Sequence, residues 1–172
     1  MSKMQPFWYF IPPPFACPEG EQVVNGGFET GDWTGWTYST ENNSAIGSSN
    51  PRSGKYHARL WRGMNPLPPW NWVYGWIRQD FPVPIRAECF TAFGYWARVD
   101  QAIAYATFTI GYDDGSQMVM DDLIIDASYR YHDHLSSLAS GKKVSWFKIQ
   151  YKILQWDTNL DIDDVTGVTT QP

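Results

Sequence analysis

A run of aromatic side chains between residues 59 and 76 is the part of the sequence best suited to hold a ligand. Prolines, asparagines and a glycine interrupt the run over 63–71, which indicates a loop joined to strands. Aromatic rings stack on the apolar C–H faces of sugar rings, and neighbouring polar groups bond the hydroxyls. We therefore predict a carbohydrate-binding site formed by Arg59, Trp61, Trp70, Trp72, Tyr74 and Trp76. The alternative is that these rings belong to the core and to a loop packed by its prolines.

Other residue patterns that could carry chemistry are weak. The motifs of serine hydrolases, zinc metalloproteases and phosphate-binding loops are absent. Asp121 and Asp122 lie near an expected hairpin, where acids are ordinary surface residues. His132 and His134 could bind a transition metal, but no third ligand stands out, so we expect a solvated pair in a polar loop. We predict that the protein is not an enzyme.

The elements that position these residues are expected to be strands. Apolar side chains alternate with threonine and glycine from Ala104 to Tyr112, and with lysine and glutamine from Val144 to Ile153. This period of two is typical of strands with one buried face. Further strands are expected over 23–24, 45–46, 56–61, 73–81, 90–99, 117–125 and 160–168, and 126–143 is expected to be irregular. The chain is therefore predicted to be all-β, a jelly-roll β-sandwich of about eight or nine antiparallel strands.

Composition restricts the partners. The 172 residues carry a net charge of -5 and no basic stripe, so nucleic acid is not expected as a partner. No run of 18 apolar residues occurs, so no membrane span is expected. The chain contains 10 tryptophans, more than one small core needs, so some should lie at the surface. We assign Trp36, Trp96 and Trp146 to the core.

The N-terminal segment differs from the rest of the chain. Aromatic residues fill 7–10, and prolines at positions 6 and 12–14 prevent a continuous apolar helix, so no cleavable signal peptide is recognisable. We expect an extended arm over 1–21 and a sandwich over 22–172. The arm is too apolar to remain in water, so we predict that it packs on a neighbouring subunit of a homo-oligomer.

The two cysteines, Cys17 and Cys89, allow one disulfide. Such a bond would attach the arm to the sandwich. The alternative is a pair of buried thiols, and the sequence does not decide between the two.

Four different short motifs lie along the expected sandwich, one at each end and two between them. They are Asn25-Gly26-Gly27-Phe28-Glu29 followed by Trp36, the Ser53-Gly54 turn, Gln79-Asp80-Phe81-Pro82-Val83, and Asp163-Asp164-Val165. In these motifs the chain resembles the calcium-containing β-jelly-roll carbohydrate-binding modules, the type appended to xylanases and cellulases, within the galactose-binding-like superfamily. The resemblance spans about residues 22–168, and the arm lies outside it.

The resemblance implies a structural Ca²⁺ at one edge of the sandwich. Carried over by motif, its ligands are Glu29, Asp163 and backbone carbonyls near Lys55. Asp163 is preferred to Asp164 because strand parity puts it on the same side as Val165. Calcium takes several oxygen ligands, and two carboxylates brought together need a cation or a proton. The alternative is that both are ordinary exposed acids.

Two functions remain open at this stage. We predict a non-catalytic subunit of a surface, filament or virion-type assembly that has this fold and can bind glycan. Three features favour it: no recognisable signal peptide, no attached catalytic domain, and the aromatic arm. The alternative is a soluble module that recognises a polysaccharide by Trp and Tyr stacking. Either would be located at an extracellular surface or on a virion.

Overall fold

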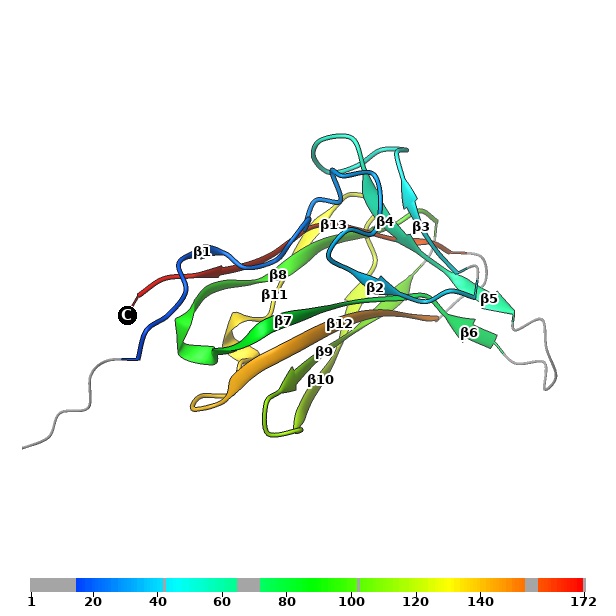
Figure 1. Ribbon diagram of the computed structural model, residues 1–172. Coiled ribbons are helices and arrows are strands. Elements are labelled where there is room, and N and C mark those ends of the chain that lie inside the picture. Colours follow the sequence, from blue (N-terminus) through cyan, green and yellow to red (C-terminus); the bar gives the residue numbers. More distant parts are fainter. Residues whose placement is uncertain (1–14, 42, 65–71, 102, 154–157, 172) are drawn as a thin grey trace, which may run out of the picture.

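Strands dominate the structure, a computed structural model that describes residues 15–41, 43–64, 72–101, 103–153 and 158–171. Within these residues, thirteen strands pair into two facing sheets and one small hairpin (Figure 1). All of these pairs are antiparallel. The described helices are two 3₁₀ turns, Ala87–Cys89 (η1) and Leu135–Ser137 (η2). The predicted all-β sandwich is confirmed, and several very short strands bring the number above eight or nine.

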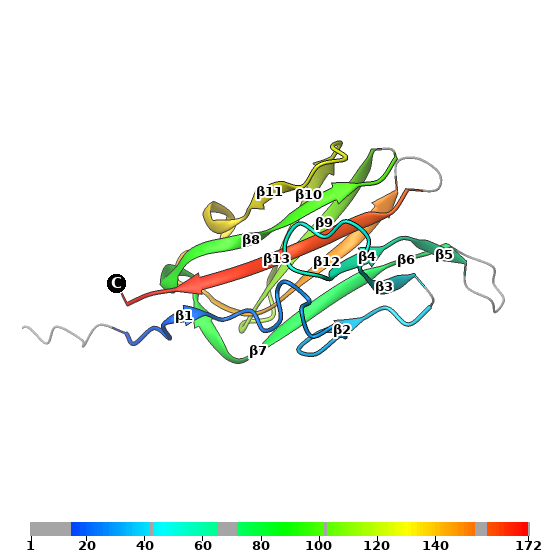
Figure 2. The ribbon, with the colours of Figure 1, turned by 90° about the horizontal axis from the view of Figure 1, so that it is seen from above.

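One sheet has six strands and holds both ends of the described chain. Its order is β11-β8-β13-β4-β3, and β1 pairs with the last residues of β13. The strands are Gly20–Glu21 (β1), Ser44–Gly47 (β3), His57–Leu60 (β4), Phe90–Val99 (β8), Arg130–Asp133 (β11) and Leu160–Thr169 (β13). Figure 2 shows β13 and β8 side by side along the length of this sheet.

The facing sheet has five strands in the order β10-β9-β12-β7-β2. The strands are Thr37–Tyr38 (β2), Trp76–Arg86 (β7), Ala104–Tyr112 (β9), Gln117–Ile124 (β10) and Lys143–Ile153 (β12). A separate hairpin of Arg62–Met64 (β5) and Trp72–Tyr74 (β6) projects from one end of the sandwich (Figure 1). β12 is the middle strand, so its side chains lie between those of β9 and β7.

The core between the sheets is strongly aromatic. The Phe93 ring centre lies 5.7 Å from that of Phe108 and 5.4 Å from that of Phe147. Trp36 packs edge-on against Phe147 at 5.6 Å and against Phe28 at 5.3 Å. These rings are buried, as are the alternating apolar residues of β9 that the sequence placed on one face. Burying side chains of this size supplies most of the driving force for folding.

The opening motif contacts the closing strand, as predicted. The N–H of Val165 donates to the carbonyl of Gly26 at 3.0 Å, and a Cβ on Gly26 would lie 2.0 Å from the Val165 carbonyl oxygen. Only glycine therefore permits this approach. The expected strand at 23–24 is wrong: the side chain of Gln79 bonds both the N–H and the carbonyl of Val24, at 2.8 and 2.9 Å. These bonds replace those of a strand partner, and the strand lies earlier, at β1.

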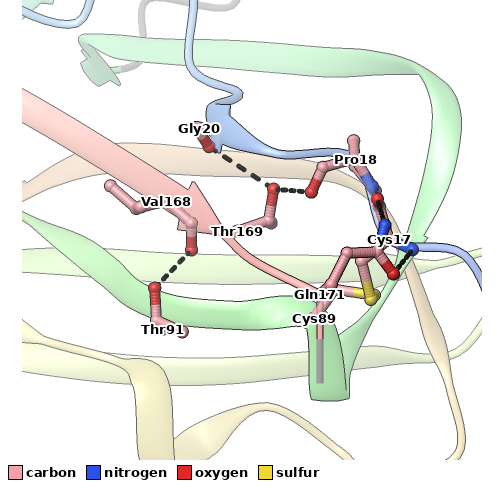
Figure 3. Close-up of a disulfide and its surroundings, with 8 residues drawn as sticks. All are labelled: Cys17, Pro18, Gly20, Cys89, Thr91, Val168, Thr169 and Gln171. Carbon is pink, nitrogen blue, oxygen red and sulfur yellow. Dashed lines mark hydrogen bonds between the residues drawn. A yellow bond between two sulfur atoms is a disulfide. The ribbon is translucent and has the colours of Figure 1, made fainter.

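A disulfide joins Cys17 to Cys89, with the two Cα atoms 5.5 Å apart (Figure 3). The hydroxyl of Thr169 donates to the carbonyl of Pro18 at 2.6 Å, and the side-chain amide of Gln171 bonds the main chain of Cys17 (Figure 3). The last part of the expected arm is thus bonded to both η1 and the end of β13. The boundary between residues 21 and 22 stays a prediction, and residues 1–14 lie outside the described part of the chain.

Two further expectations are wrong. The span 126–143 contains a strand, β11, and η2. Trp96 and Trp146 are half-buried on the outer faces of the two sheets, whereas Trp36 is in the core with 6% of its area exposed. Interior strands such as β8 and β12 carry large side chains on both faces, so alternation alone does not show which face is inside.

Candidate functional site

The two predicted calcium-ligand carboxylates come from opposite ends of the chain to one loop, 52–56. Both oxygens of Glu29 accept the N–H of Lys55 at 3.0 Å, and one also accepts the N–H of Tyr56 at 3.1 Å. Asp163 accepts the N–H of Arg52 at 2.8 Å and of Ser53 at 3.2 Å. The prediction that these acids lie near the 53–54 turn is therefore correct in position.

Asp163 is fully buried, and no cationic side chain in the described residues pairs with it. Arg52 instead forms an ion pair with Asp164. Burial, reinforced by the charge of Asp164, raises the pKa of Asp163 to about 6 despite its backbone hydrogen bonds. A buried carboxylate of this kind favours either a proton or a nearby cation.

Three acids surround Gly27. A Cβ built on Gly27 would lie 3.1 Å from Asp164 Oδ1, 3.7 Å from Glu29 Cγ and 3.9 Å from Asp163 Oδ1. Carboxylate oxygens are ligands that suit a hard cation such as Ca²⁺. Within the described residues, no group of three or more His, Cys, Asp or Glu side chains has the geometry of a metal site, so any ion here would need backbone oxygens or water as well.

The predicted ligand-binding residues fall in three places. Trp70 lies outside the described residues. Arg59, on β4, bonds both oxygens of Asp161, at 2.6 and 2.9 Å, and Arg98 bonds the same acid at 2.7 Å. Burial raises the pKa of Asp161, but bonds from His57 and Arg59 hold it at about 2. Arg59 is therefore part of an ion cluster on the six-stranded sheet.

Trp61 and Trp72 meet at a pocket of about 350 Å³ at the end of the sandwich, beside the β5–β6 hairpin. We call it the end pocket; its lining is Trp61, Arg62, Trp72, Tyr151, Thr158 and Asn159. The guanidinium of Arg62 lies 3.6 Å from the centre of the Trp72 ring, which is 44% exposed. The half-buried Tyr74 ring lies 6.3 Å from Tyr151. The sequence thus located two aromatic members of this pocket but not its arginine.

Trp76 lies elsewhere, on the outer face of the five-stranded sheet. Its side chain and those in register with it alternate with buried core residues, so they point away from the six-stranded sheet. We call this surface the outer sheet face. Its members in the three inner strands include Trp76, Arg78, Asp80, Tyr105, Thr107, Thr109, Trp146, Lys148, Gln150 and Lys152.

Trp146 lies against the backbone of the outer sheet face. The Cβ that Gly111 lacks would lie 2.0 Å from the indole ring, so glycine is needed for the ring to occupy this place. The guanidinium of Arg78 is 4.1 Å from the ring centre. The indole and the guanidinium together form a half-buried platform, which the alternation in β12 did not reveal because glycine and tryptophan lie on different strands.

Polar side chains surround this platform. Across the sheet, Gln150 is in register with Trp76 on one side and Thr107 on the other. The ammonium of Lys148 donates to Gln150 Oε1 at 3.0 Å. Burial and the charge of Arg78 lower the pKa of Lys148. The face therefore combines aromatic surface with amide, hydroxyl and cationic groups.

His132 and His134 do not form a solvated pair. His134 is 3% exposed, its ring is stacked at 4.1 Å on Phe108, and its Nε2 lies 2.8 Å from Asp122 Oδ2. Desolvation lowers the pKa of His132. The expectation failed because β11 places these residues at the sheet edge facing β10 rather than in a loop.

The chain was compared with known proteins. No protein-family model and no curated protein matches it. Among solved structures, TmCBM61 in complex with β-1,4-galactotriose superposes with a TM-score of 0.62 at 16% identity, covering 87% of this chain and 99% of that one. The CBM22-1 xylan-binding domain of Paenibacillus barcinonensis Xyn10C gives 0.61 at 12% identity, covering 91% and 99%. These structures show that the fold is that of carbohydrate-binding modules.

A viral protein also has this fold. The enzymatically active domain of bacteriophage CBA120 tailspike protein 4 superposes with a TM-score of 0.55 at 13% identity. The match covers 87% of this chain and 21% of the tailspike chain. Separately, none of the helices in the described ranges has the length and apolar character needed to cross a membrane.

Proposed function

We propose that the protein is a non-catalytic glycan-binding domain and that its outer sheet face is the binding surface. The carrying observation is that Trp76 and the Trp146–Arg78 platform share one open sheet face with Gln150 and Lys148. Flat aromatic surface beside hydrogen-bonding groups suits the two faces of a sugar ring. The likeness in fold to a galactotriose complex and a xylan-binding domain supports the proposal.

The acids of this face support a role without catalysis. Asp80 pairs with Arg78, and Asp121 pairs with Lys152. The two acids lie on β7 and β10, three strand spacings apart, which is at least about 14 Å. Glycosidases hold their two carboxyl groups roughly 5–9.5 Å apart. This pair is therefore too widely separated for glycoside hydrolysis.

The test is binding to neutral galactan and xylan, measured by affinity electrophoresis and calorimetry. Trp76→Ala should weaken binding about tenfold or more, since burying one such ring is worth roughly 1.5–3 kcal/mol. Tyr131→Ala is the matched control: its ring is 37% exposed on the other sheet, and the change should leave binding as it was. Loss of binding only in Trp72→Ala would place the site in the end pocket instead. Absence of binding to every polysaccharide on a glycan array would contradict the function.

We also propose that Glu29 and Asp163 hold a structural Ca²⁺ together with backbone oxygens of the 52–56 loop. The buried carboxylate of Asp163, which has no cationic partner among the described residues, and the three acids around Gly27 support this. Ca²⁺ should raise the melting temperature relative to chelator at pH 7.5, because it binds only the folded state. Asp163→Asn should abolish that difference, and Asp126→Asn, on the surface, should preserve it. An equal melting temperature with and without Ca²⁺ would refute the site.

A second candidate function is a subunit of a surface, filament or virion-type assembly, located outside the cell or on a virion. The fold shared with a phage tailspike domain supports it. The Cys17–Cys89 disulfide is also consistent with an oxidising environment. The oligomeric state and the role of the arm decide between the two candidates.

A further inference from the structure

Lys148 lies at the centre of the outer sheet face. It belongs to β12, the middle strand of five, and is in register with Arg78 on β7 and Thr109 on β9. Its ammonium bonds the side chain of Gln150, and within the described residues it forms no ion pair with an acid. The side chain is half-buried. A charge held in such a place without a counter-charge is destabilising.

The nearby acids already bond other side chains. Asp80 accepts bonds from Arg78, and Asp121 is bonded by both Lys152 and Thr107. Arg78 and Lys152 are therefore paired with these two acids, and Lys148 between them is left without an acidic partner among the described residues. This local excess contrasts with the net charge of -5 of the whole chain. At physiological ionic strength charges are screened over about 8 Å, so the local charge decides what binds here.

We propose that the outer sheet face prefers an anionic polysaccharide, with Lys148 bonding a carboxylate or sulfate group of a sugar residue beside the Trp146–Arg78 platform. The inference rests on the proposed glycan-binding function of the same face and specifies its ligand. The anion would supply the counter-charge that Lys148 lacks, and Gln150 and Thr107 would bond hydroxyls of the same chain.

An independent property of Lys148 agrees with this. Its pKa is lowered by burial and by the charge of Arg78, which means that the folded protein without ligand disfavours the ammonium form. A bound anion would offset the repulsion from Arg78 and would give the partly buried ammonium a charged partner. A neutral sugar would leave the repulsion between Lys148 and Arg78 in place and desolvate the ammonium further.

The experiment uses two matched ligand pairs: polygalacturonate with its methyl ester, and a sulfated galactan with its desulfated form. Affinities of the full-length protein are measured by calorimetry at fixed ionic strength. We expect at least one anionic member to bind about tenfold tighter than its neutral partner, since hydrogen bonds to charged groups are worth roughly 1.5–3 kcal/mol against about 1 for neutral ones. The pair that shows the preference identifies carboxylate or sulfate as the group recognised.

Lys148→Met should bring the ratio of anionic to neutral affinity to about one. Lys143→Met is the matched control: this lysine is exposed on the same strand beside Asp113, and the ratio should not change. Circular dichroism verifies that both variants are folded. A wild-type ratio near one, or a ratio that Lys148→Met does not alter, would overturn the inference while the neutral ligands still bind. Failure of all four ligands, together with galactan and xylan, would overturn the glycan-binding function itself.

Discussion

Asp163 is a residue whose acidity is set by its neighbours. The side chain has no exposed area, and burial raises its pKa to about 6 from an ordinary value of 3.8. The folded state therefore prefers the protonated carboxyl group. Its contribution to stability is fully present below pH 4 and is lost as the pH rises through about 6, a change on the order of 3 kcal/mol.

This gives a prediction for pH dependence. Without Ca²⁺, the free energy of unfolding contributed by Asp163 should fall between pH 4 and 6, because the deprotonated side chain is left buried without a cation. Added Ca²⁺ should restore stability above pH 6 and have little effect at pH 4.5, where a proton occupies the carboxyl group. Chemical denaturation at pH 4.5 and above pH 6, with Ca²⁺ and with chelator, measures the free energy of unfolding under each condition. A calcium effect of the same size at both pH values would show that Asp163 is not the titrating ligand.

At the scale of elements, β10 and β11 form one open side of the sandwich and are joined by polar contacts. Asp122 of β10 accepts the hydroxyl of the buried Tyr95, on β8, at 2.5 Å and lies 2.8 Å from Nε2 of His134, the residue that follows β11. The two strands belong to different sheets. This cluster therefore holds together edges that no backbone ladder connects.

Substituting Asp122 tests how much this cluster of polar contacts stabilises the fold. We expect Asp122→Ala to lower the free energy of unfolding by about 2–4 kcal/mol, because two buried polar partners lose their acceptor. Asp121→Ala, on the same strand but exposed and paired with Lys152, should cost less than about 1 kcal/mol. Urea denaturation compares the two variants. Equal losses would mean that the edge contacts add nothing to stability beyond a surface ion pair.

At the scale of the whole molecule, the point where the arm joins the sandwich lies beside an apolar groove of about 530 Å³. The groove is lined by residues that include Ala16, Phe81, Pro82, Val83 and Pro84. Val83 is 72% exposed, so the groove offers apolar surface to an occupant. Because prolines stiffen a chain, the prolines at 12–14 of the sequence predict that the arm reaches a second copy rather than folding back on the same one. We propose this groove as the docking surface of the predicted homo-oligomer.

Deletion of 2–14 tests the assembly. The sandwich should remain folded, because Cys17 and β1 are retained, but the oligomer should dissociate into monomers by light scattering. Val83→Asp should have the same effect through the groove, and Val119→Asp, exposed on β10, serves as the control. A full-length monomer, or a truncated protein of unchanged mass, would favour the soluble glycan-binding module.

The sequence alone determined most of the long strands and the core tryptophan Trp36, and the family resemblance added the meeting of the two terminal motifs. The single strand expected over 73–81 is wrong in its bounds: β6 ends at Tyr74, and β7 begins at Trp76 and continues to Arg86. The strand β8 was predicted with its observed bounds, and β9 likewise, because alternation and turn residues act within a few positions of one another. The strand β11 escaped prediction, because its mostly exposed, polar residues carry no apolar alternation.

Only the tertiary structure decided which surfaces can act. Cys17 and Cys89 are separated by 72 positions, so their pairing depended on how the chain returns to itself. Trp146 required Gly111 from another strand, and the isolation of Lys148 required the registers with both β7 and β9. Side-chain alternation tells that a strand has two faces, whereas the packing of the second sheet decides which of them meets water.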